Sequence, residues 1–162
     1  MQNGFSTQLV KIIFATDLSC AKALEPMRYQ SFDGTVYEIP YCQPTDFAST
    51  PPLTWGPPLY LIPTGWWAIP AMGHDAAFQN TLLVVNEDGS KTKANLTEQQ
   101  CNALFLEMMQ AIKPNPTLFE KLQMEAIYEG VTIGGWHAFK EDRGTEKDFP
   151  EVIPDVPNAP IL

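Results

Sequence analysis

Proline is concentrated in one stretch of this 162-residue chain, and that stretch limits what the chain can fold into. Residues 40–70 hold eight of the fifteen prolines, including the pairs Pro51-Pro52 and Pro57-Pro58. Because proline fixes φ and lacks an N–H, the stretch cannot form a regular helix or a central strand. It is also aromatic, with Trp55, Tyr60, Trp66 and Trp67. We therefore expect it to pack on a domain, with the tryptophans filling core beneath a long loop; a ligand groove lined by them is the alternative.

Short β-branched runs precede this stretch. Leu9–Ala15 and Thr35–Ile39 are both typical of strands, and the second run follows the turn signal Asp33-Gly34. Met27–Ser31 lies on the other side of that turn, so the sequence predicts an antiparallel hairpin.

Helical patterns follow the proline-rich stretch. We expect a helix over Ile69–Leu83, because Pro70 is tolerated in a first turn. His74 and Phe78 would share one face of that helix, with Asp75 and Gln79 on the adjacent one. Asp88-Gly89 within Val84–Lys93 then predicts a surface hairpin.

Two more helices are predicted. Thr97 and Gln100 form a capping-box signal, and Pro114 ends the apolar pattern that follows. The apolar positions keep a 3.6-residue period: Cys101, Leu104, Phe105, Met108 and Ile112. Asn115-Pro116 restarts a helix. Its expected stripe comprises Leu118, Leu122 and Ala126, interrupted by Glu125 and widened by Phe119 and Ile127. Its expected end lies before Trp136, where Gly130, Gly134 and Gly135 weaken the pattern.

Strands followed by helices predict one α+β domain over residues 1–140, a small antiparallel sheet from the N-terminal third packed against two or three helices. Residues 141–162 would form an acidic, proline-rich arm. We expect this arm to clasp a neighbouring subunit or a groove on its own domain, and its deletion to leave the domain folded. Its contact residues would be Pro150, Val152, Ile153, Pro154, Val156, Pro157, Pro160, Ile161 and Leu162.

Charge and hydropathy exclude some classes of partner. The net charge is −9, and no lysine or arginine lies between Arg28 and Lys91. Because nucleic-acid affinity depends on lysine and arginine contacts to phosphates, we expect no nucleic-acid partner. We also expect no membrane span, since no apolar run approaches the roughly 20 residues that a bilayer requires. The N-terminus has no basic region followed by a long apolar core, so we expect no secretory signal.

The cysteines are three and widely spaced, at Cys20, Cys42 and Cys101. An odd number without close pairs predicts buried free thiols and no disulfide framework. Cys42, Cys101, His74 and His137 also lack the close paired spacing of zinc sites, so we expect no metal and no cofactor.

The strongest candidate for a site combines two segments. TDFASTPP, at Thr45–Pro52, is an acidic and hydroxylic loop stopped by proline, and His74-Asp75 lies on the predicted helix after it. In one hypothesis His74 is a general base, Asp46 orients it and Asp75 is a second carboxylate. Ser49 as nucleophile is weaker, because no G-x-S-x-G elbow surrounds it. In the other hypothesis His74 is buried and ties the loop to the helix, while Asp46 caps backbone amides.

These motifs resemble a family of small uncharacterised proteins found mostly in bacteriophages and prophages. Its signature is TDFAS(I)P, then HDxxY, then D-x-x-F-x-x-A-M, and then a tyrosine-bearing helix that ends in Gly-Trp. The resemblance covers roughly Met27 to Phe139. Thr45, Ser49, His74, Asp75, Tyr128 and Trp136 match the signature. Phe78 stands for its tyrosine and Asn102 for its aspartate, so a hydroxyl and a charge are lost.

The resemblance implies a phage-encoded protein, and the two lost polar groups favour a structural role over catalysis. We therefore expect a minor virion or tail-associated component acting through protein–protein contacts. Its partners would be other phage proteins or a host protein, in the host cytoplasm during infection and then in the virion. The alternatives are a small hydrolase of cell-wall or other polymer bonds, which would use the His-Asp site, and an early phage protein that binds a host defence factor.

Overall fold

The computed structural model describes residues 4–5, 12–14, 21–41, 43–45, 57 and 65–142. Five antiparallel strands form the main sheet, in the order β1-β4-β5-β7-β8. Their bounds are Gly4–Phe5, Met27–Gln30, Val36–Ile39, Leu83–Val85 and Lys91–Lys93. A second sheet has the order β2-β3-β6, over Ile12–Phe14, Ala21–Ala23 and Pro44–Thr45. The described residues also form three helices: α1 (Ala68–Phe78), α2 (Glu98–Ile112) and α3 (Leu118–Asp142).

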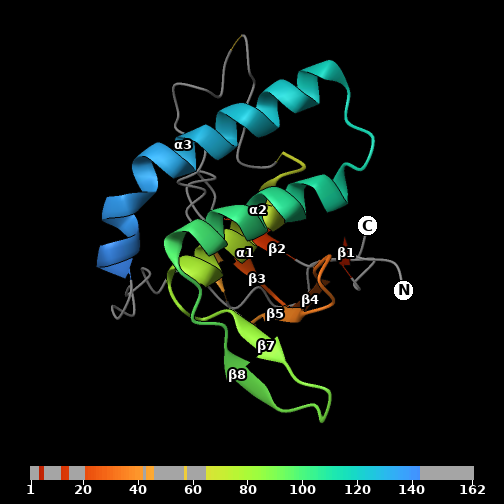
Figure 1. The fold of residues 1–162 in the computed structure, drawn as a ribbon, viewed down its shortest axis with the longest axis vertical. Coiled ribbons are helices and arrows are strands. Elements are labelled where there is room, and N and C mark those ends of the chain that lie inside the picture. The colour runs from red at the N-terminus through yellow and green to blue at the C-terminus, as the bar shows by residue number, and fades with distance from the viewer. Residues whose placement is uncertain are drawn as a thin grey trace.

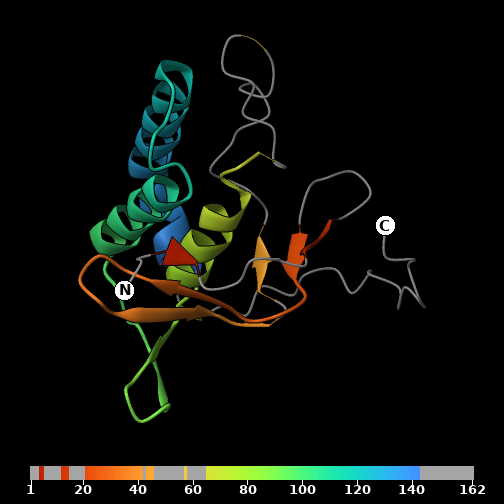
Figure 2. The same cartoon turned by 90° about the vertical axis from the view of Figure 1, so that its right-hand side faces the viewer.

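The predicted α+β class is confirmed, with the helices stacked on one side of the main sheet (Figure 1). The sheet also takes strands β7 and β8 from the middle of the chain, in addition to those of the N-terminal third. In Figure 2 the β7–β8 hairpin extends beyond the body of the molecule. The predicted strand Leu9–Ala15 is present as β2, and its outer residues lie outside the described part.

The hairpin predicted around Asp33-Gly34 is confirmed. β4 and β5 pair with Met27 opposite Ile39 and Tyr29 opposite Tyr37. Gly34 adopts φ +93°, a conformation that glycine takes without the penalty a Cβ brings. The carboxylate of Asp33 accepts the N–H of Thr35 at 2.8 Å, which closes the turn.

Helix α1 ends at Phe78, five residues earlier than the sequence predicted. Asn80 adopts φ +56°, and asparagine is one of the few residues that tolerate this left-handed conformation at a helix end. The N–H of Thr81 then bonds back to the carbonyl of Ala76 at 2.9 Å. This termination frees Leu83 to enter strand β7.

One of the two predicted helix caps is confirmed, and the other was placed two residues too early. Thr97 and Gln100 form the capping box of α2, and the helix ends at Ile112, before Pro114. The cap of α3 is Thr117, not Asn115: its hydroxyl accepts the N–H of Glu120 at 3.2 Å, and Glu120 accepts the N–H of Thr117 at 2.8 Å.

Two predictions for α3 were wrong. The helix does not end before Trp136 but continues to Asp142. Each interior glycine costs only about 0.5–1 kcal/mol relative to alanine, which packing further along the helix offsets: the ring of Phe139 meets that of Phe78 at 5.2 Å. The core face is also not centred on Leu118 and Leu122, although Ile127 of the predicted stripe is buried and Ala126 is partly buried against the core. Its buried residues are Gln123, Met124, Ile127 and Val131, whereas Leu118, Phe119 and Leu122 are exposed.

The core lies between the sheet and the helices. Met27, Tyr29 and Ile39 rise from the sheet to meet apolar side chains of all three helices. Helix α1 approaches α2 so closely that a Cβ on Gly73 would lie 2.6 Å from the sulfur of Met108. Of the tryptophans, Trp67 is buried as expected and Trp66 is half-buried against it, while Trp55 lies outside the described residues. Cys101 is buried and forms no disulfide with a described residue, as expected; Cys20 and Cys42 are not described.

Candidate functional site

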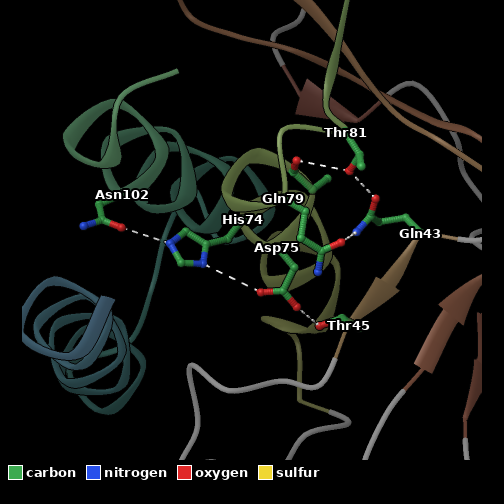
Figure 3. A network of polar contacts seen from close by, with 8 residues as sticks. Gln43, Thr45, His74, Asp75, Gln79, Thr81 and Asn102 are labelled. Atoms are coloured by element: carbon green, nitrogen blue, oxygen red, sulfur yellow. Dashed lines mark hydrogen bonds and ion pairs between the residues drawn. The ribbon is translucent and has the colours of Figure 1, made fainter. Parts of the chain in front are cut away.

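Helix α1 presents two adjacent faces that the sequence predicted. His74 and Phe78 lie one turn apart, with ring centroids 4.1 Å apart. Asp75 and Gln79, one position further on, point instead toward the segment that contains Gln43 and Thr45 (Figure 3). The two faces together connect α1 to α2 on one side and to strand β6 on the other. We call these residues and their direct partners the His74 network: Gln43, Thr45, His74, Asp75, Gln79, Thr81 and Asn102.

The imidazole of His74 is enclosed. It lies between the rings of Phe78 and Phe105, the latter at 4.8 Å, and only 5% of the residue is exposed. Its Nε2 lies 2.9 Å from Oδ1 of Asn102 on α2, which is also buried. Because a carbonyl oxygen only accepts hydrogen bonds, this orientation requires the hydrogen on Nε2.

The other ring nitrogen is directed toward a carboxylate. Nδ1 of His74 lies 3.9 Å from Oδ1 of Asp75, too far for a hydrogen bond. Within the described part of the chain, this buried Nδ1 has no hydrogen-bond partner. Nδ1 therefore faces the Asp75 carboxylate without a hydrogen bond between the two groups.

Asp75 joins α1 to the start of the TDFAS motif. The hydroxyl of Thr45 donates a short hydrogen bond to Oδ2 of Asp75. Thr45 is fully buried in β6, where it pairs with Ala21 of β3. The first residue of the motif is therefore held both by a sheet and by the helix that carries His74.

Three residues that the sequence did not assign to the site extend the network. The side-chain amide of the buried Gln43 donates to Oε1 of Gln79 at 2.9 Å. Oε1 of Gln43 accepts a hydrogen bond from the hydroxyl of Thr81 at 2.5 Å. Thr81 immediately follows the left-handed Asn80, so the end of α1 is fixed to the segment before the TDFAS motif. Only the position of Gln79, one turn from Asp75, could have indicated this from the sequence.

The remaining predicted site residues have different outcomes. Asp46 and Ser49 lie outside the described residues, as do all predicted contact positions of the C-terminal arm from Pro150. Tyr128 is partly buried beside the core on α3, and Trp136 lies further along the same helix.

Burial limits which reactions the side chains of the His74 network could catalyse. A general base must come within about 2.6–3.2 Å of the proton that it removes. His74 is instead enclosed between two phenyl rings, and its Nε2 is hydrogen-bonded to the internal side chain of Asn102. Within the described ranges, no cluster of three or more His, Cys, Asp or Glu residues is arranged to hold a metal ion. The network joins β6, α1 and α2 through groups that are largely satisfied by one another.

Comparison of the chain with protein-family models, with curated proteins and with solved structures finds no match. Among the described residues, no helix has the length and apolar character needed to cross a membrane.

Proposed function

We propose that this protein acts through protein–protein contacts as a minor virion or tail-associated component of a bacteriophage. Its partners are other phage proteins, which it meets in the host cytoplasm before it enters the particle. The resemblance of TDFAS and His74-Asp75 to phage protein motifs supports the phage assignment. The burial of His74 and its hydrogen bond to Asn102 favour a role in protein contacts over a role in catalysis.

The observation that carries the proposal is the enclosure of the most reactive motif side chain. His74 is 95% buried, packs on Phe78 and Phe105, and bonds Asn102 through Nε2. The asparagine keeps the shape and hydrogen-bonding capacity of the aspartate expected there but not its charge. These features suit a residue that fixes α1 against α2.

The outer surface supplies apolar area for contacts. The large exposed apolar side chains of the described residues are Leu24, Phe32, Tyr41, Leu118, Phe119, Leu122 and Ile133. Four of these belong to α3: Leu118, Phe119 and Leu122 lie together at its start, where they expose apolar area for a partner, and Ile133 lies further along the helix.

Mass spectrometry of purified phage particles, together with a pull-down from infected cells, tests the proposal. We expect the protein in the particles and a phage structural protein in the pull-down. Absence from particles together with no stable partner contradicts the proposal. Co-purification with a host protein alone supports instead an early protein that binds a host defence factor.

The alternative, a small hydrolase, is favoured by one feature. His74 Nδ1 lies 3.9 Å from the Asp75 carboxylate and has no hydrogen-bond partner among the described residues, so this ring nitrogen is not committed to an internal hydrogen bond there. Release of soluble fragments from cell-wall polymer by the purified protein tests this. His74→Gln is the matched control, because glutamine retains a hydrogen-bonding side chain. Activity in the wild type that is absent from a folded His74→Gln protein establishes the hydrolase; no release by either supports the contact function.

A further inference from the structure

Hydrogen bonds connect β6 to α1 and α1 to α2, but this chain of contacts is interrupted at the ring of His74. Thr45 in β6 donates to Oδ2 of Asp75, and Nε2 of His74 lies 2.9 Å from Oδ1 of Asn102 in α2. Between these two hydrogen bonds, 3.9 Å separates Nδ1 of His74 from Oδ1 of Asp75. Figure 3 shows the three contacts in succession, from Thr45 to Asn102.

The interrupted contact is unfavourable as long as the ring is neutral. A ring with its hydrogen on Nε2 alone has a lone pair at Nδ1, and this lone pair and the carboxylate of Asp75 repel each other. A hydrogen added to Nδ1 replaces that repulsion with the attraction of an ion pair. The two atoms already lie within the roughly 4 Å that defines such a pair, and a movement of about 1 Å would bring them to hydrogen-bond distance.

The other described neighbours of the ring are uncharged. Helix α1 places Phe78 against it, and α2 places Phe105 and Asn102 there. Helix α3 approaches through Phe139, whose ring packs on that of Phe78. Asp75 is therefore the one charged group in contact with the imidazole among the described residues. Burial works against a charged ring, but proteins accept a buried charge that is paired and hydrogen-bonded.

We propose that His74 takes up a proton at Nδ1 as the pH falls from about 8 to about 5, and that this proton completes the chain of hydrogen bonds from β6 through α1 to α2. The protonated ring donates through Nε2 to Asn102 and through Nδ1 to Asp75, while Asp75 keeps the hydroxyl of Thr45. Because Thr45 begins the TDFAS motif, acid then holds the start of that motif to both helices. This inference goes beyond the proposed function and does not rest on it.

Nitrogen-15 NMR of the imidazole tests the proton directly. The full chain is used with His137→Gln, so that His74 is the one histidine that remains. We expect a hydrogen on Nε2 alone at pH 8 and on both ring nitrogens at pH 5, and slow exchange of the Nδ1 hydrogen with solvent because the ring is buried. A ring that keeps the same protonation state throughout this range, on whichever nitrogen, overturns the proposal.

Stability shows what the proton does for the fold. Urea titrations of the wild type and His74→Gln at pH 8, 6.5 and 5 stay above the acid range in which Glu38 takes up its own proton. The unfolding equilibrium constant of the wild type, relative to that of His74→Gln, should fall at least about fivefold from pH 8 to pH 5, because a proton bound more tightly by the folded chain stabilises it. A ratio that stays constant or rises overturns the proposal.

Two variants separate the charge of Asp75 from its hydrogen bond. Asp75→Asn can still accept the hydroxyl of Thr45 but attracts no imidazolium, so the gain of stability at pH 5 should disappear. Thr45→Val removes the hydroxyl and leaves the carboxylate, so it should keep most of that gain. A gain that persists in Asp75→Asn shows that another group holds the proton, and it overturns the assignment of Asp75 as the partner of Nδ1.

Discussion

Tyr29 in β4 donates its phenolic hydrogen to Oε1 of Glu107 in α2 at 2.7 Å, which joins the main sheet to the helical layer. The same carboxylate oxygen accepts the backbone N–H of Phe32 at 2.9 Å. Burial of the tyrosine, together with the hydrogen bond and the negative charge of Glu107, raises the pKa of Tyr29 well above its ordinary value. The hydroxyl therefore remains a donor throughout the pH range in which proteins fold.

Removal of that hydroxyl should destabilise the protein. Tyr29→Phe leaves the ring in the core but deprives Glu107 of a donor, and hydrogen bonds to charged groups contribute about 1.5–3 kcal/mol. We expect a lower free energy of unfolding by about 2 kcal/mol in urea titration. Glu107→Gln, which keeps an acceptor for both donors, should cost less. Equal stability of Tyr29→Phe and the wild type would contradict the importance of this contact.

The pair formed by His74 and Asn102 should behave as a coupled unit. Asn102→Leu removes the acceptor of a buried N–H and should lower the free energy of unfolding by about 1–3 kcal/mol. Replacing both partners, as His74→Phe with Asn102→Leu, removes the unsatisfied group and should recover part of the loss. A double variant whose loss equals the sum of both single losses would show that the two residues act independently.

Glu38 should make stability depend on acid pH. Its burial favours the neutral form, but hydrogen bonds and charges from Lys91 at 2.6 Å and Arg28 at 3.0 Å outweigh that effect and lower its pKa. Because the folded pKa lies below the ordinary 4.5, the stabilisation is complete above pH 4.5 and is lost as the pH falls through the folded value.

The measurement is the urea midpoint between pH 7 and pH 3 for the wild type and Glu38→Gln. The wild type should lose more stability on acidification than the variant, which has no carboxylate to protonate at this position. Identical pH profiles for the two proteins would contradict this account of Glu38.

Two helical glycines should respond oppositely to alanine. At Gly73 a Cβ would meet Met108 at 2.6 Å and Ile39 at 3.3 Å, so Gly73→Ala should destabilise by about 1–3 kcal/mol through overpacking. At Gly130 a Cβ meets nothing, so Gly130→Ala should stabilise by about 0.5–1 kcal/mol. Melting temperatures of dilute protein compare the two. A stabilising Gly73→Ala would mean that α1 and α2 pack less tightly than described.

Local signals predicted much of the fold. The Asp33-Gly34 turn and the Thr97 capping box each depend on a few neighbouring residues, so the sequence alone indicates them. The end of α1 was predicted too late because Asn80 in a left-handed conformation is not distinguishable, by residue type, from Asn80 in a helix. The core face of α3 was predicted only in part, through Ile127 and Ala126, because apolar residues lie on more than one side of the helix and only the position of α2 and α1 decides which side is buried.

The candidate site was likewise predicted only where its contacts are local in the sequence. The alignment of His74 with Phe78 follows from helical spacing and was predicted. The contacts between Thr45 and Asp75, and between Gln43 and Thr81, join residues 30 and 38 positions apart, and no local pattern specifies them. Asn102 was identified only as a departure from a family signature, whereas its contact with His74 depends on how α2 packs over α1.

Strand β8 ends the order of the main sheet, and its sequence is Lys-Thr-Lys with all three residues exposed. A sheet edge offers unpaired backbone groups to which another chain could add a strand and begin aggregation. Lysines at such an edge discourage this, because a second copy would bring its own lysines alongside them. The concentration at which this protein remains free of fibrils should therefore fall if Lys91 and Lys93 are replaced by threonine.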